Sequence, residues 1–99
     1  MEAEKKETLQ VKKEIRIGIQ MTQVEDLGTD NPDLMITIKN NGPAREIEYF
    51  ITDQQSRPDW TSKLYSGDEV TIRLGDYKKG TFLALTNRDF QEANVLLKW

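Results

Sequence analysis

The sequence predicts an all-β fold in which two antiparallel sheets pack face to face as a β-sandwich of about seven strands. Along most of the chain, apolar and polar residues alternate with a period of two, as they do in strands that bury one face. Residues that favour turns separate these runs about every eight to twelve positions. No segment carries a convincing helical pattern, so strands are expected throughout.

The first apolar series begins at Leu9 and occupies odd positions as far as Met21, with Lys13 as the one interruption. This pattern predicts one long strand with a wet face, or two strands separated by a kink near Gly18. The segment 25–33 is rich in turn formers and is expected to be a loop.

The central stretch, residues 34–51, is predicted to be a β-hairpin. Its two halves, 34–39 and 46–51, both alternate, and Asn40-Asn41-Gly42-Pro43 between them is typical of a sharp turn. Shorter strands are expected at 60–65, 70–74 and 93–99, together with a central strand at 81–86 that is apolar on both faces. The residues predicted to form the core are Ile17, Ile19, Ile36, Ile38, Tyr49, Ile51, Leu64, Ile72, Leu83, Val95 and Leu97.

This count of strands favours an immunoglobulin-like sandwich, with a small β-barrel as the alternative. Two turn segments, Lys39–Ala44 and Leu64–Ile72, bear on the type of sandwich. They resemble bacterial and archaeal immunoglobulin-like adhesion and accessory domains, which carry an Asn-x-Gly turn after the second strand and a Leu-x-Pro-Gly-Glu turn before a later one. This chain has Ser66 in place of the proline and Asp68 in place of the glutamate. The resemblance spans about half the chain, implies the fold and carries no functional residues across.

The composition describes one folded domain and removes several kinds of chemistry. A chain of 99 residues is long enough to bury roughly 60–65% of its unfolded surface and fold unaided. It contains neither cysteine nor histidine, so it lacks disulfides, thiolate metal sites and the commonest general base. The net charge of −3 gives no general reason to approach nucleic acid, although a local patch can oppose the total.

The domain is expected to span residues 9–99, preceded by a flexible N-terminal arm at 1–8. No apolar run is long enough to span a membrane, and the charged first residues lack the apolar segment of a signal peptide. The chain is therefore expected inside a cell or virion, or as a mature extracellular fragment whose leader has been removed.

Acidic side chains gather in the predicted loop at 25–33, where calcium would find oxygen ligands. The spacing of a recognisable calcium loop is missing, so solvated loop carboxylates are the preferred interpretation and no cofactor is predicted. The four candidate ligands are Glu25, Asp26, Asp30 and Asp33.

The aromatic residues carry the binding hypotheses. In the predicted hairpin, Met35 and Phe50 point away from the core on adjacent strands and would form a small apolar patch for a protein contact. Trp60, Tyr65 and Tyr77 are candidates for stacking on sugar rings.

The sequence therefore predicts a non-catalytic protein-interaction or structural module. It would belong to a larger assembly, such as a virion or a surface appendage, or serve as an accessory immunoglobulin-like domain. A protein partner or self-association is expected, and nucleic acid is not. The alternative function is a carbohydrate-binding domain that uses the exposed aromatic residues. No nucleophile motif, phosphate-binding loop or carboxylate cleft supports an enzyme.

Overall fold

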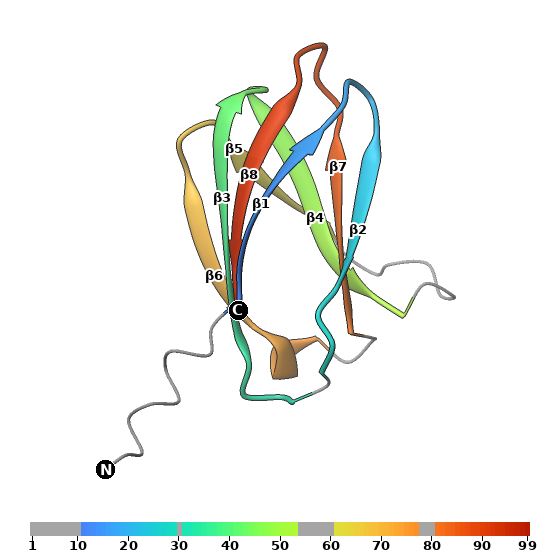
Figure 1. Ribbon diagram of the computed structural model, residues 1–99, viewed down its shortest axis with the longest axis vertical. Helices are drawn as coiled ribbons and strands as arrows, with labels where there is room; N and C mark the ends of the chain where they lie inside the picture. Colours follow the sequence, from blue (N-terminus) through green and yellow to red (C-terminus); the bar gives the residue numbers. More distant parts are fainter. Residues whose placement is uncertain (1–10, 30, 54–60, 78–80) are drawn as a thin grey trace.

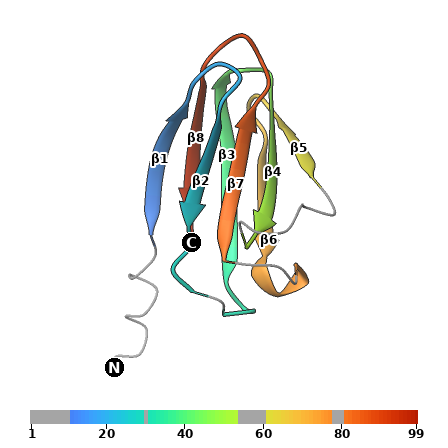
Figure 2. The same ribbon diagram turned by 90° about the vertical axis from the view of Figure 1, so that its right-hand side faces the viewer.

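The computed structural model describes residues 11–29, 31–53, 61–77 and 81–99. In these segments, eight strands form two four-stranded antiparallel sheets that face one another (Figure 1, Figure 2), which confirms the predicted β-sandwich. The strands are β1 (Lys12–Ile17), β2 (Thr22–Asp26), β3 (Met35–Pro43), β4 (Glu46–Thr52), β5 (Ser62–Tyr65), β6 (Glu69–Arg73), β7 (Phe82–Asn87) and β8 (Ala93–Lys98). A single turn of 3-10 helix, η2 (Leu74–Asp76), follows β6.

One sheet has the strand order β1-β8-β3-β6 and the other has the order β2-β7-β4-β5. The first strand pairs with the last, the second with the seventh, the third with the sixth and the fourth with the fifth. The chain is therefore a long antiparallel ribbon rolled up on itself, which is the arrangement of a jelly roll. This strand order differs from the ABED and CFG sheets of immunoglobulin domains.

The predicted hairpin at 34–51 is wrong. β3 pairs with β6 and β8, whereas β4 pairs with β5 and β7 in the other sheet. The turn after Asn40 carries the chain from one sheet to the other. Alternation reports which face of a strand is buried but not which strand lies beside it, so a hairpin and a crossing between sheets give the same pattern.

The apolar series from Leu9 to Met21 also crosses between sheets. β1 and β2 are separate strands on the two sheets, and the chain turns between them at Gly18, whose carbonyl accepts a hydrogen bond from the Met21 amide at 3.2 Å. Glu25 and Asp26 belong to β2, so the loop predicted at 25–33 begins later.

The core lies between the sheets and is built from the inward residues of seven strands, while β2 contributes through Leu27, which directly follows it. Ten of the eleven predicted core residues are buried, and Ile19 is the exception. Ile19 is 52% exposed because the turn after β1 ends the alternation that placed it inside. The strand predicted to be covered on both faces is β7, which lies inside its sheet between β2 and β4, and Ala84 on its outer face is buried.

Candidate functional site

Four chain connections meet at one end of the sandwich, at the top of Figure 1. They join β1 to β2, β3 to β4, β5 to β6 and β7 to β8, and we call this the loop end. Large apolar side chains are exposed here to an unusual degree: Phe90 is 80% exposed and Met21 is 59% exposed. Exposed apolar residues that gather in one region mark interaction sites more often than scattered ones do. The loop-end surface consists of Ile19, Met21, Tyr65 and Phe90.

The loop that presents Phe90 is fixed by hydrogen bonds within the protein. The Asn87 side chain is fully buried, and its Nδ2 donates to the carbonyls of Ile17, Gly18 and Gln91 at 2.7–3.2 Å. One Asn87 amide group thus ties the β7–β8 loop to the end of β1. Because an amide has two donors and two acceptor lone pairs, a single asparagine can brace several backbone groups.

Asp89 fixes the same loop from its other side. One carboxylate oxygen accepts the backbone amide of Arg45 at 2.7 Å, and the other accepts the amide of Phe90 at 2.7 Å. These hydrogen bonds stabilise the ionised carboxylate, so the pKa of Asp89 lies below its usual value. The carboxylate joins the β7–β8 loop to the β3–β4 crossing.

Gln20 connects the two loops that carry most of the exposed apolar surface. Its Nε2 donates to the carbonyls of Arg88 and Asp89 at 2.6 and 3.2 Å. Gln20 also has a positive φ of 59°, which is uncommon for a residue other than glycine. The β1–β2 turn and the β7–β8 loop are therefore held together, and their apolar side chains share one end of the molecule.

The crossing from β3 to β4 is built around a second buried asparagine. The fully buried Asn40 donates from Nδ2 to the carbonyls of Ala44 and Leu64 and accepts the Gly42 amide on Oδ1 at 2.8 Å. Gly42 has a φ of 74°, and a Cβ there would lie 2.8 Å from the Ser66 hydroxyl oxygen. The turn therefore requires glycine at this position.

A cleft of about 370 Å³ opens beside the loop-end surface. Two of its charged residues have partners, because Glu46 lies 3.5 Å from Lys63 and the Arg88 Nε lies 3.0 Å from Glu48. The guanidinium of Arg45 makes no ion pair with any residue that the structure describes. The cleft is lined by Arg45, Glu46, Tyr65, Arg88 and Asp89.

Met35 and Phe50 do not form the patch that the hairpin implied. Met35 is 51% exposed on β3, and Phe50 is half-buried on β4, in the other sheet. Both point away from the core, as predicted, but from opposite faces of the sandwich.

Tyr65 and Tyr77 are also separated. Tyr65 ends β5 at the loop end, opposite Glu46, and is 51% exposed. Tyr77 follows η2 at the other end of the sandwich, where it packs against the core and burial raises its pKa. Trp60 lies outside the described residues. These tyrosines therefore cannot form one flat stacking platform.

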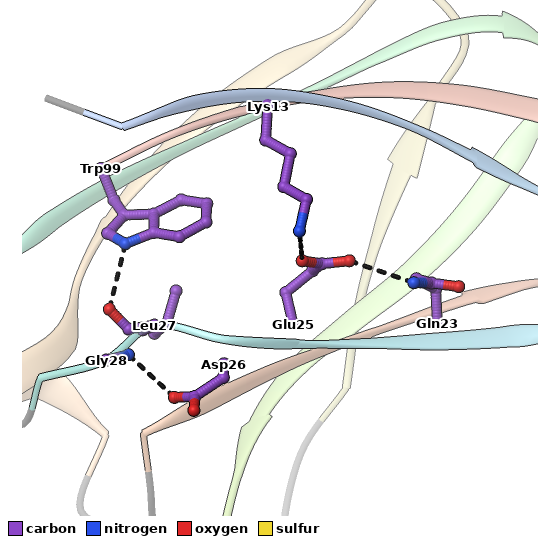
Figure 3. Close-up of polar contacts among 7 residues, drawn as sticks. All are labelled: Lys13, Gln23, Glu25, Asp26, Leu27, Gly28 and Trp99. Carbon is purple, nitrogen blue, oxygen red and sulfur yellow. Dashed lines mark hydrogen bonds and ion pairs between the residues drawn. The ribbon is translucent and has the colours of Figure 1, made fainter.

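The described candidate calcium ligands form hydrogen bonds or ion pairs within the protein, and Figure 3 shows those of Glu25 and Asp26. Glu25 is buried and accepts a 2.7 Å hydrogen bond from Lys13, so it joins β2 to β1 across the edge of the two sheets. Asp26 points the other way and accepts the Gly28 amide at 2.8 Å. Asp33 lies 3.1 Å from Arg73. No three metal-ligating side chains gather among the described residues, and Asp30 lies outside them, so calcium here stays an untested hypothesis.

Sequence reasoning missed most of the loop end. It assigned Ile19 to the core and gave no role to Asn87 or Gln20, which bond to residues 68 to 70 positions away in the chain. The one available signal was Gly18, which interrupts the apolar series at the point where the chain turns.

The described residues contain no helix that could cross a membrane. Comparison with protein-family models, curated proteins and solved structures finds no match to this chain.

Proposed function

We propose that this chain is a non-catalytic protein-binding module that docks its partner through the loop-end surface. The observation that carries the proposal is the setting of Phe90. Its side chain is 80% exposed, yet the backbone on either side is held by Asn87 and Asp89.

A rigid loop that displays an apolar ring is suited to binding a protein. Ordering a loop on binding costs free energy, and a loop fixed in advance avoids most of that cost. Large aromatic side chains at the centre of an interface commonly supply much of the binding energy. Tyr65 adds a second ring on the neighbouring β5–β6 corner, and the cleft beside it would receive a side chain of the partner.

The charges around this surface also favour a contact dominated by apolar groups. Asp89, Glu46 and Arg88 are satisfied within the protein, so a partner covering them would not need to supply their counterions. Among the charged residues that line the cleft, Arg45 is the one whose charged group is left without an ion pair or hydrogen bond among the described residues. Its guanidinium would donate hydrogen bonds to a carboxylate of the partner at the rim of the contact. Such a module suits a component of a larger assembly or an accessory domain.

The first test places a photo-crosslinking phenylalanine analogue at position 90 or at position 35. Met35 is a matched control because it is also apolar and exposed, but it begins β3 at the opposite end. In extracts of the native source, the probe at 90 is expected to give a discrete crosslinked protein that the probe at 35 does not give. Equal crosslinking from both positions would contradict a specific loop-end contact.

The second test uses the partner so identified, in purified form. Phe90→Ser is expected to raise its dissociation constant by about thirtyfold, the effect of losing a 2 kcal/mol hot spot. Met35→Ser should leave the constant within about twofold, as expected outside the interface. Comparable losses from both variants, with the fold of each intact by circular dichroism, would refute the proposed surface.

A further inference from the structure

The outward strand positions of the β1-β8-β3-β6 sheet carry a charge opposite to that of the whole chain, although Arg16 and Arg73 among them also pair with carboxylates beyond the strands. These outward positions hold five cations and two carboxylates, a net charge of +3 on a chain whose total is −3. These positions follow from the register, because their inward neighbours are the residues that face the core. The cations are Lys12, Arg16, Lys39, Arg73 and Lys98, and the carboxylates are Glu14 and Glu69.

Three of these cations form a diagonal line across β1, β8 and β3. Lys12 lies directly opposite Lys98, which in turn lies opposite Thr37. Lys39, two residues beyond Thr37, is therefore diagonal to Lys98, within reach of a long side chain. Lys12, Lys98 and Lys39 make no ion pair with any part of the chain that the structure describes.

The pairing of Lys12 with Lys98 is the close kind. Val11 and Trp99 exchange both backbone hydrogen bonds, so the next pair, Lys12 and Lys98, is a non-hydrogen-bonded pair whose side chains lie nearer together. Like charges directly opposite one another destabilise a sheet. An anion bound between the two ammonium groups would remove this repulsion.

The same face also offers hydrogen-bonding groups beside the cations. A cleft of about 320 Å³ opens over the irregular pairing of β3 with β8, next to Arg16. Its lining includes two side-chain amides, Asn41 and Asn94, and the carboxylate of Glu14. The Asn94 amide also donates to the Gly42 carbonyl at 2.9 Å, which fixes it in place.

We propose that this face binds an acidic polysaccharide, whose sulfate or carboxylate groups would lie along the three lysines and whose hydroxyl groups would meet the amides and threonines. The threonines are Thr37 and Thr71, whose hydroxyl oxygens lie 2.9 Å apart on the same face. Single-stranded nucleic acid is the less suitable ligand, because none of the outward positions of these four strands is aromatic and bases need rings to stack on. This surface is separate from the loop-end surface and does not depend on the proposed protein contact.

The test measures binding of the intact chain to heparin, with neutral dextran as the control polymer. We expect heparin binding that weakens steeply as salt rises, and no binding of dextran. Lys98→Gln should weaken heparin binding by about three- to tenfold at low salt, as expected when one central contact between a lysine and an anionic group of the polymer is lost. Lys12→Gln/Lys39→Gln/Lys98→Gln should abolish it.

Lys63→Gln is the matched control, because it removes the same charge from β5, in the other sheet. The heparin affinity of this variant should stay within about twofold of that of the unaltered chain, since the Lys63 ammonium group is remote from the bound polymer. Absence of heparin binding at low salt would overturn the proposal, and so would an equal loss in Lys63→Gln. Tighter binding to single-stranded DNA, or to vesicles of anionic lipid, than to heparin would also overturn the assignment to a polysaccharide.

Discussion

At the scale of single residues, Asn40 and Asn87 determine the shape of the loop end. Each occupies an inward-facing strand position, has no exposed surface and bonds to backbone groups from more than one connection. A buried polar side chain costs free energy unless its hydrogen bonds are made, and here backbone groups of the loop end make them. These residues therefore stabilise a particular loop geometry.

Asn40→Ala is expected to lower the free energy of unfolding by about 2–3 kcal/mol, because it leaves buried backbone groups without partners. The matched control is Asn41→Ala, which alters the exposed neighbour and should cost less than about 0.5 kcal/mol. Urea unfolding followed by tryptophan fluorescence would measure both values. Equal costs would show that the buried amide contributes nothing specific.

Asp89 gives the loop end a dependence on pH. Its pKa lies below the ordinary value of 3.8 because it accepts two backbone amides. A carboxyl whose folded pKa is lowered stabilises the protein above its unfolded pKa, and this contribution is lost as the pH falls through the folded pKa. The amide proton shifts of Arg45 and Phe90 should therefore titrate together in NMR spectra, with a midpoint below 3.8.

Asp89→Asn should abolish this shared titration while the rest of the spectrum keeps its native dispersion. A midpoint at or above 3.8 in the unaltered protein would mean that the two amides do not stabilise the carboxylate.

At the scale of elements, the ion pair between Lys13 and Glu25 closes one edge of the sandwich. β1 and β2 are edge strands of different sheets, and the pair joins them where apolar residues would otherwise continue (Figure 3). The indole of Trp99 adds a second link by donating to the Leu27 carbonyl at 3.1 Å. A charge that points inward on an edge strand also discourages pairing with another chain.

Removing one member of this pair should cost more than removing both. Lys13→Met leaves the buried Glu25 carboxylate without its cation, and we expect a loss of about 1–3 kcal/mol, less than for a fully buried pair because Lys13 is half exposed. The double variant Lys13→Met/Glu25→Leu should recover most of that loss. It should also self-associate more readily, which light scattering across concentration would detect.

Arg16→Met is the control for this cycle, because its ion pair with Glu92 is long, at 3.6 Å, and exposed. It should change stability by less than about 0.5 kcal/mol. If the double variant were as unstable as Lys13→Met, packing around β1 rather than the unpaired carboxylate would explain the loss.

The strands themselves could be predicted from the sequence, because period-two alternation reports the buried face directly. Their partners could not. Lys13 interrupted the apolar series visibly, yet its meaning depended on Glu25, which the sequence placed in a loop. Phe90 is absent from the predicted core list, but its rigid setting depends on bonds from Asn87 to the end of β1 and to Gly18, 70 and 69 positions away, which no local pattern reveals.

At the scale of the whole molecule, the structure separates two surfaces of different character. The loop end gathers exposed apolar side chains whose charged neighbours are largely satisfied within the protein. The outer face of the β1-β8-β3-β6 sheet instead gathers lysines that repel one another. Because these surfaces share no residue, variants of one should not alter binding at the other.

The repulsion among Lys12, Lys98 and Lys39 should lower the free energy of unfolding when no ligand is bound. Lys98→Gln removes the repulsion from Lys12, so we expect it to raise the free energy of unfolding at low salt by about 0.2–1 kcal/mol. This gain should shrink as salt approaches about 1 M, where the Debye length falls to roughly 3 Å and the repulsion is screened. Thermal melts at several salt concentrations, with Lys63→Gln as the control, would measure this gain.

Heparin should then raise the melting temperature of the unaltered chain more than that of Lys98→Gln, because only the unaltered chain retains all three lysines of the diagonal line. A variant that is less stable than the unaltered chain at low salt would show that Lys98 serves the sheet and not a ligand.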